Sequence, residues 1–281
     1  MQFCICITTI NAVDSLNECL SAIWRSSIKP HYVVVSDDSL APEIQKENQA
    51  IVKQYLHTNY VVGPHAGVCA NRNFALERLT SLTKTDLIAF IDDDIAIDRD
   101  FIKNALAAYQ NLTSEREKTF LTGGMPTKLS FRGYFCASDL PLCVDLHTAV
   151  FPATFFETEK WDENIFFGYE DALLCLRAIK RGYRIVHCPK LKTTDTRLGK
   201  STLNLEKIGK LTKYDLYVEA ARLYVGIQRY KNLYPNPIKL ILFLTIYHIH
   251  MTIYLIKNRA LRSWLKIIYY SKGKHFSNKG F

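Results

Sequence analysis

The stretch DLIAFIDDDIAID, residues 86–98, runs from an apolar segment directly into Asp92, Asp93 and Asp94. Side chains alternate between the two faces of a strand, so we expect Asp92 and Asp94 on one side and Asp93 on the other. Neighbouring carboxylates oppose each other's ionisation, and their burial is costly unless a cation or hydrogen-bond donors compensate. Two hard oxygen ligands on one side suit a divalent cation such as Mg²⁺ or Mn²⁺. The alternative is a solvated acidic turn, because Asp is common where strands end.

Strand and helix patterns alternate around this stretch. Apolar runs rich in Val and Ile predict strands, and helical spacing of apolar residues, as in SLNECLSAIW at 15–24, predicts the helices between them. The apolar runs are continuous, which indicates strands covered on both faces. The order therefore predicts an α/β fold with a doubly wound, mainly parallel central sheet and helices on both faces. Ligands of such sheets bind beyond the carboxyl ends of the strands, where the acidic residues lie.

The second half of the chain changes character twice. Residues 120–165 are rich in aromatics and irregular in pattern. The segment YEDALLCLRAIKRGYRIV at 169–186 then predicts a helix that ends at Gly182 and a strand after it. From about residue 201 the chain is basic, rich in Tyr and helical in pattern, which predicts a C-terminal helical extension of the α/β unit over 201–281.

Charge and cysteines bound the possible surroundings of the protein. The net charge is +9, but residues 201–281 hold 14 Lys and Arg against 3 Asp and Glu, so the first 200 residues are close to neutral. A basic tail indicates an anionic partner, either membrane or nucleic acid. The eight cysteines show no zinc-like spacing and mostly lie in apolar runs, so we expect reduced thiols in a cytosolic protein. We also expect no secretory signal, since no basic leader precedes the first apolar run.

Five local patterns occur in a fixed order: TTIN at 8–11, VSDDS at 35–39, GVCANRN at 67–73, DDD at 92–94 and GYEDALLCLR at 168–177. Together they resemble the inverting nucleotide-sugar glycosyltransferases of family 2, which have the GT-A fold, and in particular the bacterial members that build cell-surface polysaccharides. The resemblance covers about residues 1–200. It implies a nucleotide-binding half at about 1–98 and an acceptor half at about 99–200.

The resemblance places the nucleotide of the donor near the first strands. Thr8 stands where the family's first strand ends beside the nucleotide. Asp37 matches the carboxylate that receives the uracil or ribose, a role that suits a hydrogen-bond acceptor. Asp38 replaces the family's usual Gly, which leaves open which acid makes this contact. Arg72 matches an arginine near the base and phosphates, where a planar cation with five donors is useful; the alternative is a solvated charge on a helix.

The same resemblance gives each residue of the acid cluster a role. Asp92 resembles the residue that faces the donor ribose, Asp94 the one that holds the metal, Mn²⁺ or Mg²⁺, and Asp93 lies between them. The cation would neutralise the diphosphate as it leaves. The family often adds a His ligand in a later loop, but that loop here contains Asp195 and no His. Either Asp195 or the pyrophosphate would complete the shell, and the nearby His187 is expected to pack in the core.

The residues Glu170 and Asp171 begin the helix predicted after residue 169. Acids are favoured there by the helix dipole, so a purely structural role is the alternative for both. In the family, the matching pair faces the acceptor, and the Asp is the general base that removes a proton from the acceptor hydroxyl. We therefore expect Asp171 to be the base and Glu170 to orient the acceptor. Trp161 and Asp162, just before, are expected to line the acceptor pocket.

The extension contains a long apolar run, LILFLTIYHIHMTIYLI at 240–256. As a helix it would span about 25 Å, short of the roughly 30 Å hydrocarbon core. Basic residues flank it on both sides, which favours helices lying in the plane of the cytoplasmic leaflet over a single membrane span. A third interpretation is a helix buried against the catalytic unit or a partner subunit. Nucleic acid is not expected, because the aromatic residues here lie in apolar stretches.

The expected function is the metal-dependent, inverting transfer of a sugar from a nucleotide-sugar donor, a UDP-sugar, to a saccharide or lipid-linked hydroxyl at the inner face of the cell membrane. One alternative is a metal-dependent nucleotidyltransferase of sugar phosphates, which would not need the GYED helix and would carry a basic, Gly-rich loop after strand one. Another alternative is a non-catalytic membrane-bound assembly protein, which would have lost the acid cluster or the Glu170–Asp171 pair.

Overall fold

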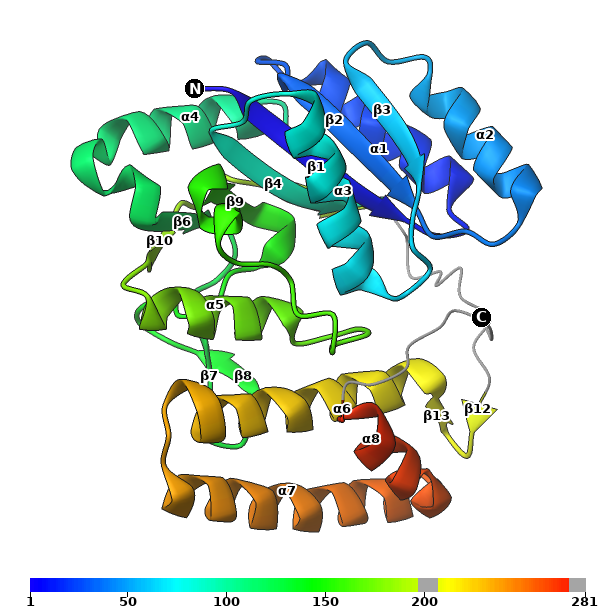
Figure 1. The fold of residues 1–281 in the computed structure, drawn as a ribbon, viewed down its shortest axis with the longest axis vertical. Helices are drawn as coiled ribbons and strands as arrows, with labels where there is room; N and C mark the ends of the chain where they lie inside the picture. The colour runs from blue at the N-terminus through cyan, green and yellow to red at the C-terminus, as the bar shows by residue number, and fades with distance from the viewer. Residues whose placement is uncertain (197–206, 273–281) are drawn as a thin grey trace.

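The computed structural model describes residues 1–196 and 207–272. Its centre is a seven-stranded sheet with the order β10-β6-β9-β4-β1-β2-β3 (Figure 1). In this sheet β9 is antiparallel to both of its neighbours, β4 and β6, and the other pairs are parallel. The mainly parallel sheet predicted from the sequence is confirmed. The strand bounds are β1 Phe3–Thr9, β2 Tyr32–Asp37, β3 Thr58–Val62, β4 Leu87–Asp92, β6 Thr119–Thr122, β9 Ala149–Pro152 and β10 Arg184–His187.

Helices cover both faces of this sheet, because alternate side chains of its buried strands point to opposite sides. Ile5 and Ala89 pack in one cluster with α1, α2 and α4, whereas Cys6 and Phe90 pack in a second cluster with α3 and α5. This arrangement confirms the doubly wound fold. The helix bounds are α1 Val13–Arg25, α2 Pro42–Val52, α3 Val68–Leu82, α4 Phe101–Asn111 and α5 Glu170–Lys180.

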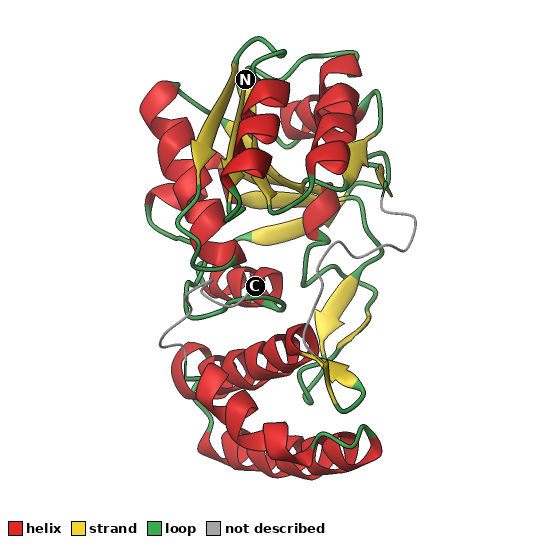
Figure 2. Cartoon of the chain, turned by 90° about the vertical axis from the view of Figure 1, so that its right-hand side faces the viewer, coloured by secondary structure: helices red, strands yellow, loops and turns green. Residues whose placement is uncertain are grey.

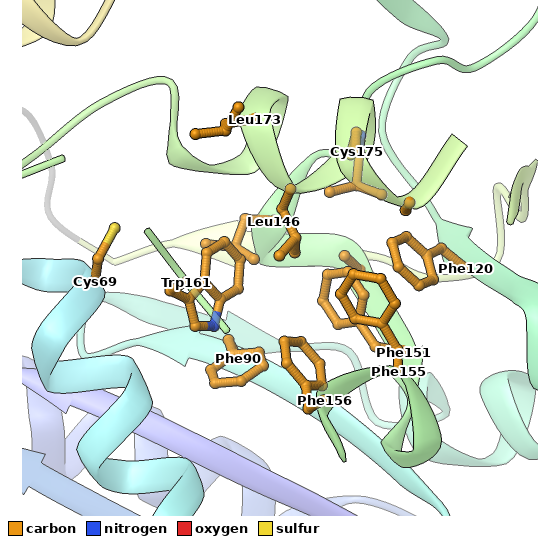
Figure 3. Packing of buried hydrophobic residues seen from close by; sticks show 14 of the residues in the cluster. Cys69, Phe90, Phe120, Leu146, Phe151, Phe155, Phe156, Trp161, Leu173 and Cys175 are labelled. Atoms are coloured by element: carbon orange, nitrogen blue, oxygen red, sulfur yellow. The ribbon is translucent and has the colours of Figure 1, made fainter. Parts of the chain in front are cut away.

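The irregular segment predicted at 120–165 forms an aromatic core beneath the sheet. Phe120 packs edge to face against both Phe151 and Phe155, each at a centroid distance of 4.8 Å, and Trp161 meets Phe90 of β4 in the same way at 5.2 Å (Figure 3). Such pairs bury large apolar surfaces and fix the mutual orientation of the rings. The short elements of this part are η1 Thr113–Lys118, β7 Thr127–Leu129, β8 Phe135–Ala137, η2 Leu146–Thr148 and η3 Ala153–Glu157.

The remaining elements include two small two-stranded sheets. In the first, β11 pairs antiparallel with β5, which follows the acid cluster, and Asp195 lies opposite Ile95. In the second, Ile208 lies opposite Leu211 just before the C-terminal helices. The bounds of these strands are β5 Ile95–Ile97, β11 Thr193–Asp195, β12 Lys207–Ile208 and β13 Leu211–Thr212.

The helical extension lies below the α/β unit, with α6 between α5 and α7 (Figures 1 and 2). α6 contributes Ala221 and Val225 to the core cluster of the sheet and α5, so it is packed on the α/β unit. α7 is four residues longer than the predicted apolar run, and it buries one face, with Phe243, Tyr247 and Met251 spaced by four residues. The bounds are α6 Lys213–Ile227, the π-helical turn η4 Gln228–Leu233, α7 Pro237–Lys257, η5 Leu261–Ser263 and α8 Trp264–Tyr270.

Candidate active site

The parallel register of the sheet brings the predicted donor-side residues together at its carboxyl edge. Thr8 lies beside Asp92 of β4, and Thr9 lies beside Asp37 of β2. The Thr8 hydroxyl donates a hydrogen bond to Asp92 Oδ1 at 3.2 Å. Residues that are more than 80 positions apart in the chain therefore form one polar edge, at the place where α/β sheets bind ligands.

Asp37 is fully buried and holds the loop after β2. Its Oδ1 accepts from the Ser39 backbone N–H at 2.8 Å, and its Oδ2 accepts from Asn48 Nδ2 at 2.9 Å and from the Tyr60 hydroxyl at 2.8 Å. Burial and this charge raise the pKa of Tyr60. Asp38, the departure noted above, is also buried and accepts from the His65 backbone N–H at 2.9 Å. Both acids thus shape the loop that borders the edge of the sheet.

Arg72 connects the two halves of the site. Gly67 lies at the N-terminus of α3 with φ of +98°, and a Cβ there would lie 2.8 Å from the Phe166 ring. Five residues on, the buried Arg72 guanidinium donates to Asp92 Oδ1 at 3.0 Å and to Glu170 Oε1 at 2.8 Å. A planar fork of donors can bridge two carboxylates in this way, which a solvated helix charge would not do.

Asp92 has a second basic partner that sequence reasoning missed. His147, in η2, places Nε2 3.1 Å from Asp92 Oδ2. Burial alone would raise the pKa of Asp92, but the charges and hydrogen bonds of Arg72 and His147 hold it well below its usual range. Burial by itself would lower the pKa of His147, but the hydrogen bond to Asp92 and the negative charges of Asp92 and Asp145 together outweigh it, so the pKa of His147 is raised. Asp92 is therefore ionised and still 26% exposed, which suits an acceptor of hydrogen bonds.

The other two acids of the cluster lie in a turn, because β4 ends at Asp92. Strand alternation therefore does not govern Asp93 and Asp94, and the expectation derived from it was wrong for these two residues. Asp93 Oδ2 accepts from the Ile10 backbone N–H at 3.3 Å. Asp94 is fully buried, and its backbone carbonyl accepts from the Thr196 N–H at 2.8 Å.

Asp195 lies beside this turn, because β11 pairs with β5 directly after Asp94. Asp94 and Asp195 offer hard oxygen ligands of the kind that Mg²⁺ and Mn²⁺ prefer. Within residues 1–196 and 207–272, no three His, Cys, Asp or Glu side chains converge as a ready metal site. Acids of this kind suit a cation that takes one or two carboxylates from the protein and its other ligands from phosphates and water, as Mg²⁺ commonly does.

Glu170 and Asp171, the pair predicted to face the acceptor, form the first turn of α5. Glu170 is 9% exposed and paired with Arg72, whereas Asp171 is half-buried and accepts from the Ala172 N–H at 2.7 Å. Burial and the neighbouring charge of Glu170 raise the pKa of Asp171 to about 7. A carboxylate with such a pKa is matched to proton transfer near neutral pH, which helix capping would not require.

Three other residues singled out from the sequence differ from expectation. Trp161 is 2% exposed and packs in the aromatic core under Arg72, with the guanidinium 5.2 Å from its ring, so it does not line an open pocket (Figure 3). Asp162 joins α5 to α6, since it accepts from Arg177 at 2.5 Å and from the Tyr224 hydroxyl at 3.1 Å. His187 is exposed on β10, so its predicted place in the core was wrong.

Comparison with known proteins finds one matching family model and solved structures of similar fold. Residues 4–114 match the sequence profile described as glycosyl transferase family 2. No curated protein sequence matches the chain. S. aureus TarS 1–349, in complex with UDP-GlcNAc, is similar with a TM-score of 0.54 and 18% identity, over 87% of this chain and 72% of that chain. The mannosyltransferase PcManGT from Pyrobaculum calidifontis, in complex with GDP-Man and Mn²⁺, is similar with a TM-score of 0.57 and 13% identity, over 98% and 76%.

Proposed function

We propose a donor, an acceptor and a mechanism for this chain, which is a family 2 glycosyltransferase of the GT-A fold. It transfers a sugar, with inversion, from a UDP-sugar to a hydroxyl of a saccharide or lipid-linked acceptor used in building a cell-surface polysaccharide. The donor class is supported by two similar structures, TarS with UDP-GlcNAc and PcManGT with GDP-Man. The nucleotide would lie along the edge formed by Thr8, Asp37 and Asp92, with Asp93 holding the adjoining loop.

The observation that carries this proposal is the chain of contacts Asp92–Arg72–Glu170, which ends beside Asp171. It ties the edge of the sheet, where a donor would bind, to the helix that carries a carboxylate with a raised pKa. In the reaction, Asp171 accepts the proton of the acceptor hydroxyl as the oxygen attacks the sugar from the side opposite the leaving diphosphate. Arg72 fixes Glu170 and Asp92 relative to each other and thereby sets the separation of acceptor and donor.

A divalent cation would be held by Asp94 and Asp195 together with the donor's phosphates. It would supply neutralisation of the charge that develops on the departing diphosphate. The Mn²⁺ in the PcManGT complex supports a divalent ion for this fold and leaves Mn²⁺ and Mg²⁺ as alternatives here.

We also place the protein at the cytoplasmic face of the membrane. α7 is the one helix within the described ranges that is long and apolar enough to span a bilayer, which alone is weak evidence. Its 21 residues would span about 31 Å, longer than the predicted apolar run, so the length of α7 does not argue against a membrane span. However, α7 packs one face on α6, and α6 packs on the α/β unit, which favours a helix lying in the plane of the leaflet.

The test is release of nucleoside diphosphate from a panel of UDP- and GDP-sugars by the full chain, with Mn²⁺, Mg²⁺ or EDTA. We expect turnover of at least one nucleotide sugar, lost in EDTA and in Asp94→Asn while the variant stays folded. Asp98→Asn is the matched control, since Asp98 is an exposed acid of the same stretch. Normal turnover by Asp94→Asn would overturn the metal assignment, and failure with every donor would overturn the proposed reaction.

A further inference from the structure

A hollow of about 650 Å³ lies where the chain turns from α6 to α7. Its walls come from α5, from η4 and the segment after it, and from the strand β7 with residues that follow β8. None of the proposed donor-site residues lines it. Most of its wall is apolar, and the lining side chains include Leu129, Leu142, Leu176, Ile179, Tyr230 and Leu233.

The hollow also has three cations and no acid among its lining residues. Lys128 and Lys239 are exposed, so their ammonium groups are free to approach a ligand at the mouth. Arg229 is half-buried, donates to the carbonyls of Leu129 and Ser130, and lies 5.1 Å from the Tyr230 ring. An apolar cavity ringed by positive charge is complementary to a molecule with an apolar body and an anionic group.

The hollow is lined in part by the helix that carries the proposed base, Asp171. Leu176 and Ile179 line it from α5, five and eight residues after Asp171, or about 7.5 and 12 Å along the helix axis. Cys143 lines it from the other side, and burial together with the charge of Asp171 raises the pKa of the Cys143 thiol to about 12. A ligand held in the hollow therefore lies about one to two helical turns of α5 from Asp171.

The mouth of the hollow opens beside an apolar surface. Lys239 is in the first turn of α7, and next to it on the same helix Ile238, Ile241 and Leu242 are 70%, 64% and 50% exposed. Such exposed aliphatic side chains mark a surface that meets another apolar phase. A lipid chain could thus leave the hollow without passing through water.

We propose that this hollow binds the phosphate-bearing end of a lipid-linked acceptor. The phosphate lies among Lys128, Arg229 and Lys239, the first part of the lipid chain lies against the apolar wall, and the attached saccharide reaches Asp171 along α5. This inference rests on the proposed function, because it assigns the acceptor of the same reaction. A bulk phospholipid would satisfy the charges but carries no saccharide that could extend along α5 to the base.

The test is binding of farnesyl monophosphate to the full chain in detergent, compared with farnesol, inorganic phosphate and phosphatidylglycerol in the same detergent. We expect saturable binding of farnesyl monophosphate alone, weakened at least about tenfold in Lys128→Gln/Lys239→Gln, since each removes a charge-assisted contact. Lys46→Gln/Lys53→Gln removes the same charge from exposed positions in and just after α2, and should bind normally. Ile179→Trp, which fills the hollow without changing charge, should also abolish binding.

Three results would overturn the proposal: equal losses in both lysine pairs, normal binding by Ile179→Trp, or farnesol binding as well as farnesyl monophosphate. Phosphatidylglycerol that competes equally would assign the hollow to a membrane headgroup and would likewise overturn the acceptor role. Release of nucleoside diphosphate by the wild-type chain is measured in parallel without any lipid. If the wild-type chain turns over a donor but does not bind farnesyl monophosphate, this inference alone is contradicted. If it binds farnesyl monophosphate but turns over no donor, the proposed reaction is contradicted.

Discussion

Asp171 could either stabilise the start of α5 through the helix dipole or act as the general base. A substitution to Asn separates these two roles. If it only stabilises the start of α5, Asn should cost no more than about 1 kcal/mol and keep activity. If it is the base, Asn cannot take the proton, and we expect turnover to fall about 10²–10⁴-fold with donor affinity retained. Turnover and donor affinity of Asp171→Asn decide this. Near-normal turnover would move the base elsewhere, with Glu170 the next candidate.

The raised pKa of Asp171 also predicts a pH dependence. The base acts in its deprotonated form, so kcat/KM should fall about tenfold per pH unit below about 7 and level off above it. Burial and the charges of Glu170 and Asp145 raise this pKa, while the Ala172 N–H and Arg72 oppose them. Asp92, with its lowered pKa, stays ionised throughout this range. A flat profile between about pH 5.5 and 8.5 would contradict the assignment.

Arg72 is predicted to stabilise the fold as well as the site. Arg72→Met would leave the buried Glu170 carboxylate without its partner, which costs about 3 kcal/mol or more. Arg72→Lys keeps the charge but cannot bridge both acids, so it should restore only part of the lost free energy of unfolding. Urea unfolding measures the difference, with Arg78→Met on the exposed side of the same helix as control. A loss below about 1 kcal/mol in Arg72→Met would show that the two contacts contribute little.

At the scale of elements, α7 has one face packed on α6 and an opposite face rich in exposed Ile and Leu. We expect Ile249→Glu/Ile253→Glu to weaken sedimentation with anionic vesicles at least several-fold and to leave thermal unfolding nearly unchanged, since both side chains are about half exposed. Gln49→Glu/Ala50→Glu adds the same charge on α2 and controls for electrostatic repulsion. Equal effects of the two pairs would argue against α7 as the membrane contact.

At the scale of the whole molecule, the extension and the α/β unit are joined by buried packing. Removing residues 236–281 should release the protein from vesicles, but it would also uncover Leu216, Leu223 and Tyr230, which pack against α7. We therefore expect a lower unfolding temperature together with lost vesicle binding. Sedimentation without vesicles separates aggregation from membrane binding. A soluble truncated chain that still sediments with vesicles would refute the membrane assignment.

Much of the fold and part of the site follow from local sequence patterns. Continuous Val and Ile runs predict a sheet buried on both faces, and strand ends predict that Thr8, Asp37 and Asp92 share one edge. The start of α5 at Glu170 and the αL position of Gly182 after it also follow from local rules. These features are predictable because they depend on residues close together in the chain, whose spacing is visible in the sequence.

Only the tertiary structure decided the features that depend on distant contacts. His147 reaches Asp92 across 55 residues, and Arg72 reaches Glu170 across 98, and neither pairing has a local pattern. Burial of Trp161, the turn that takes Asp94 out of strand alternation and the hollow beside α5 likewise depend on how elements pack. The sequence by itself determined which chemical groups the protein carries and at which edge of the sheet they gather. Packing decided which of them touch, because contact energies in a core depend on three-dimensional neighbours rather than on sequence separation.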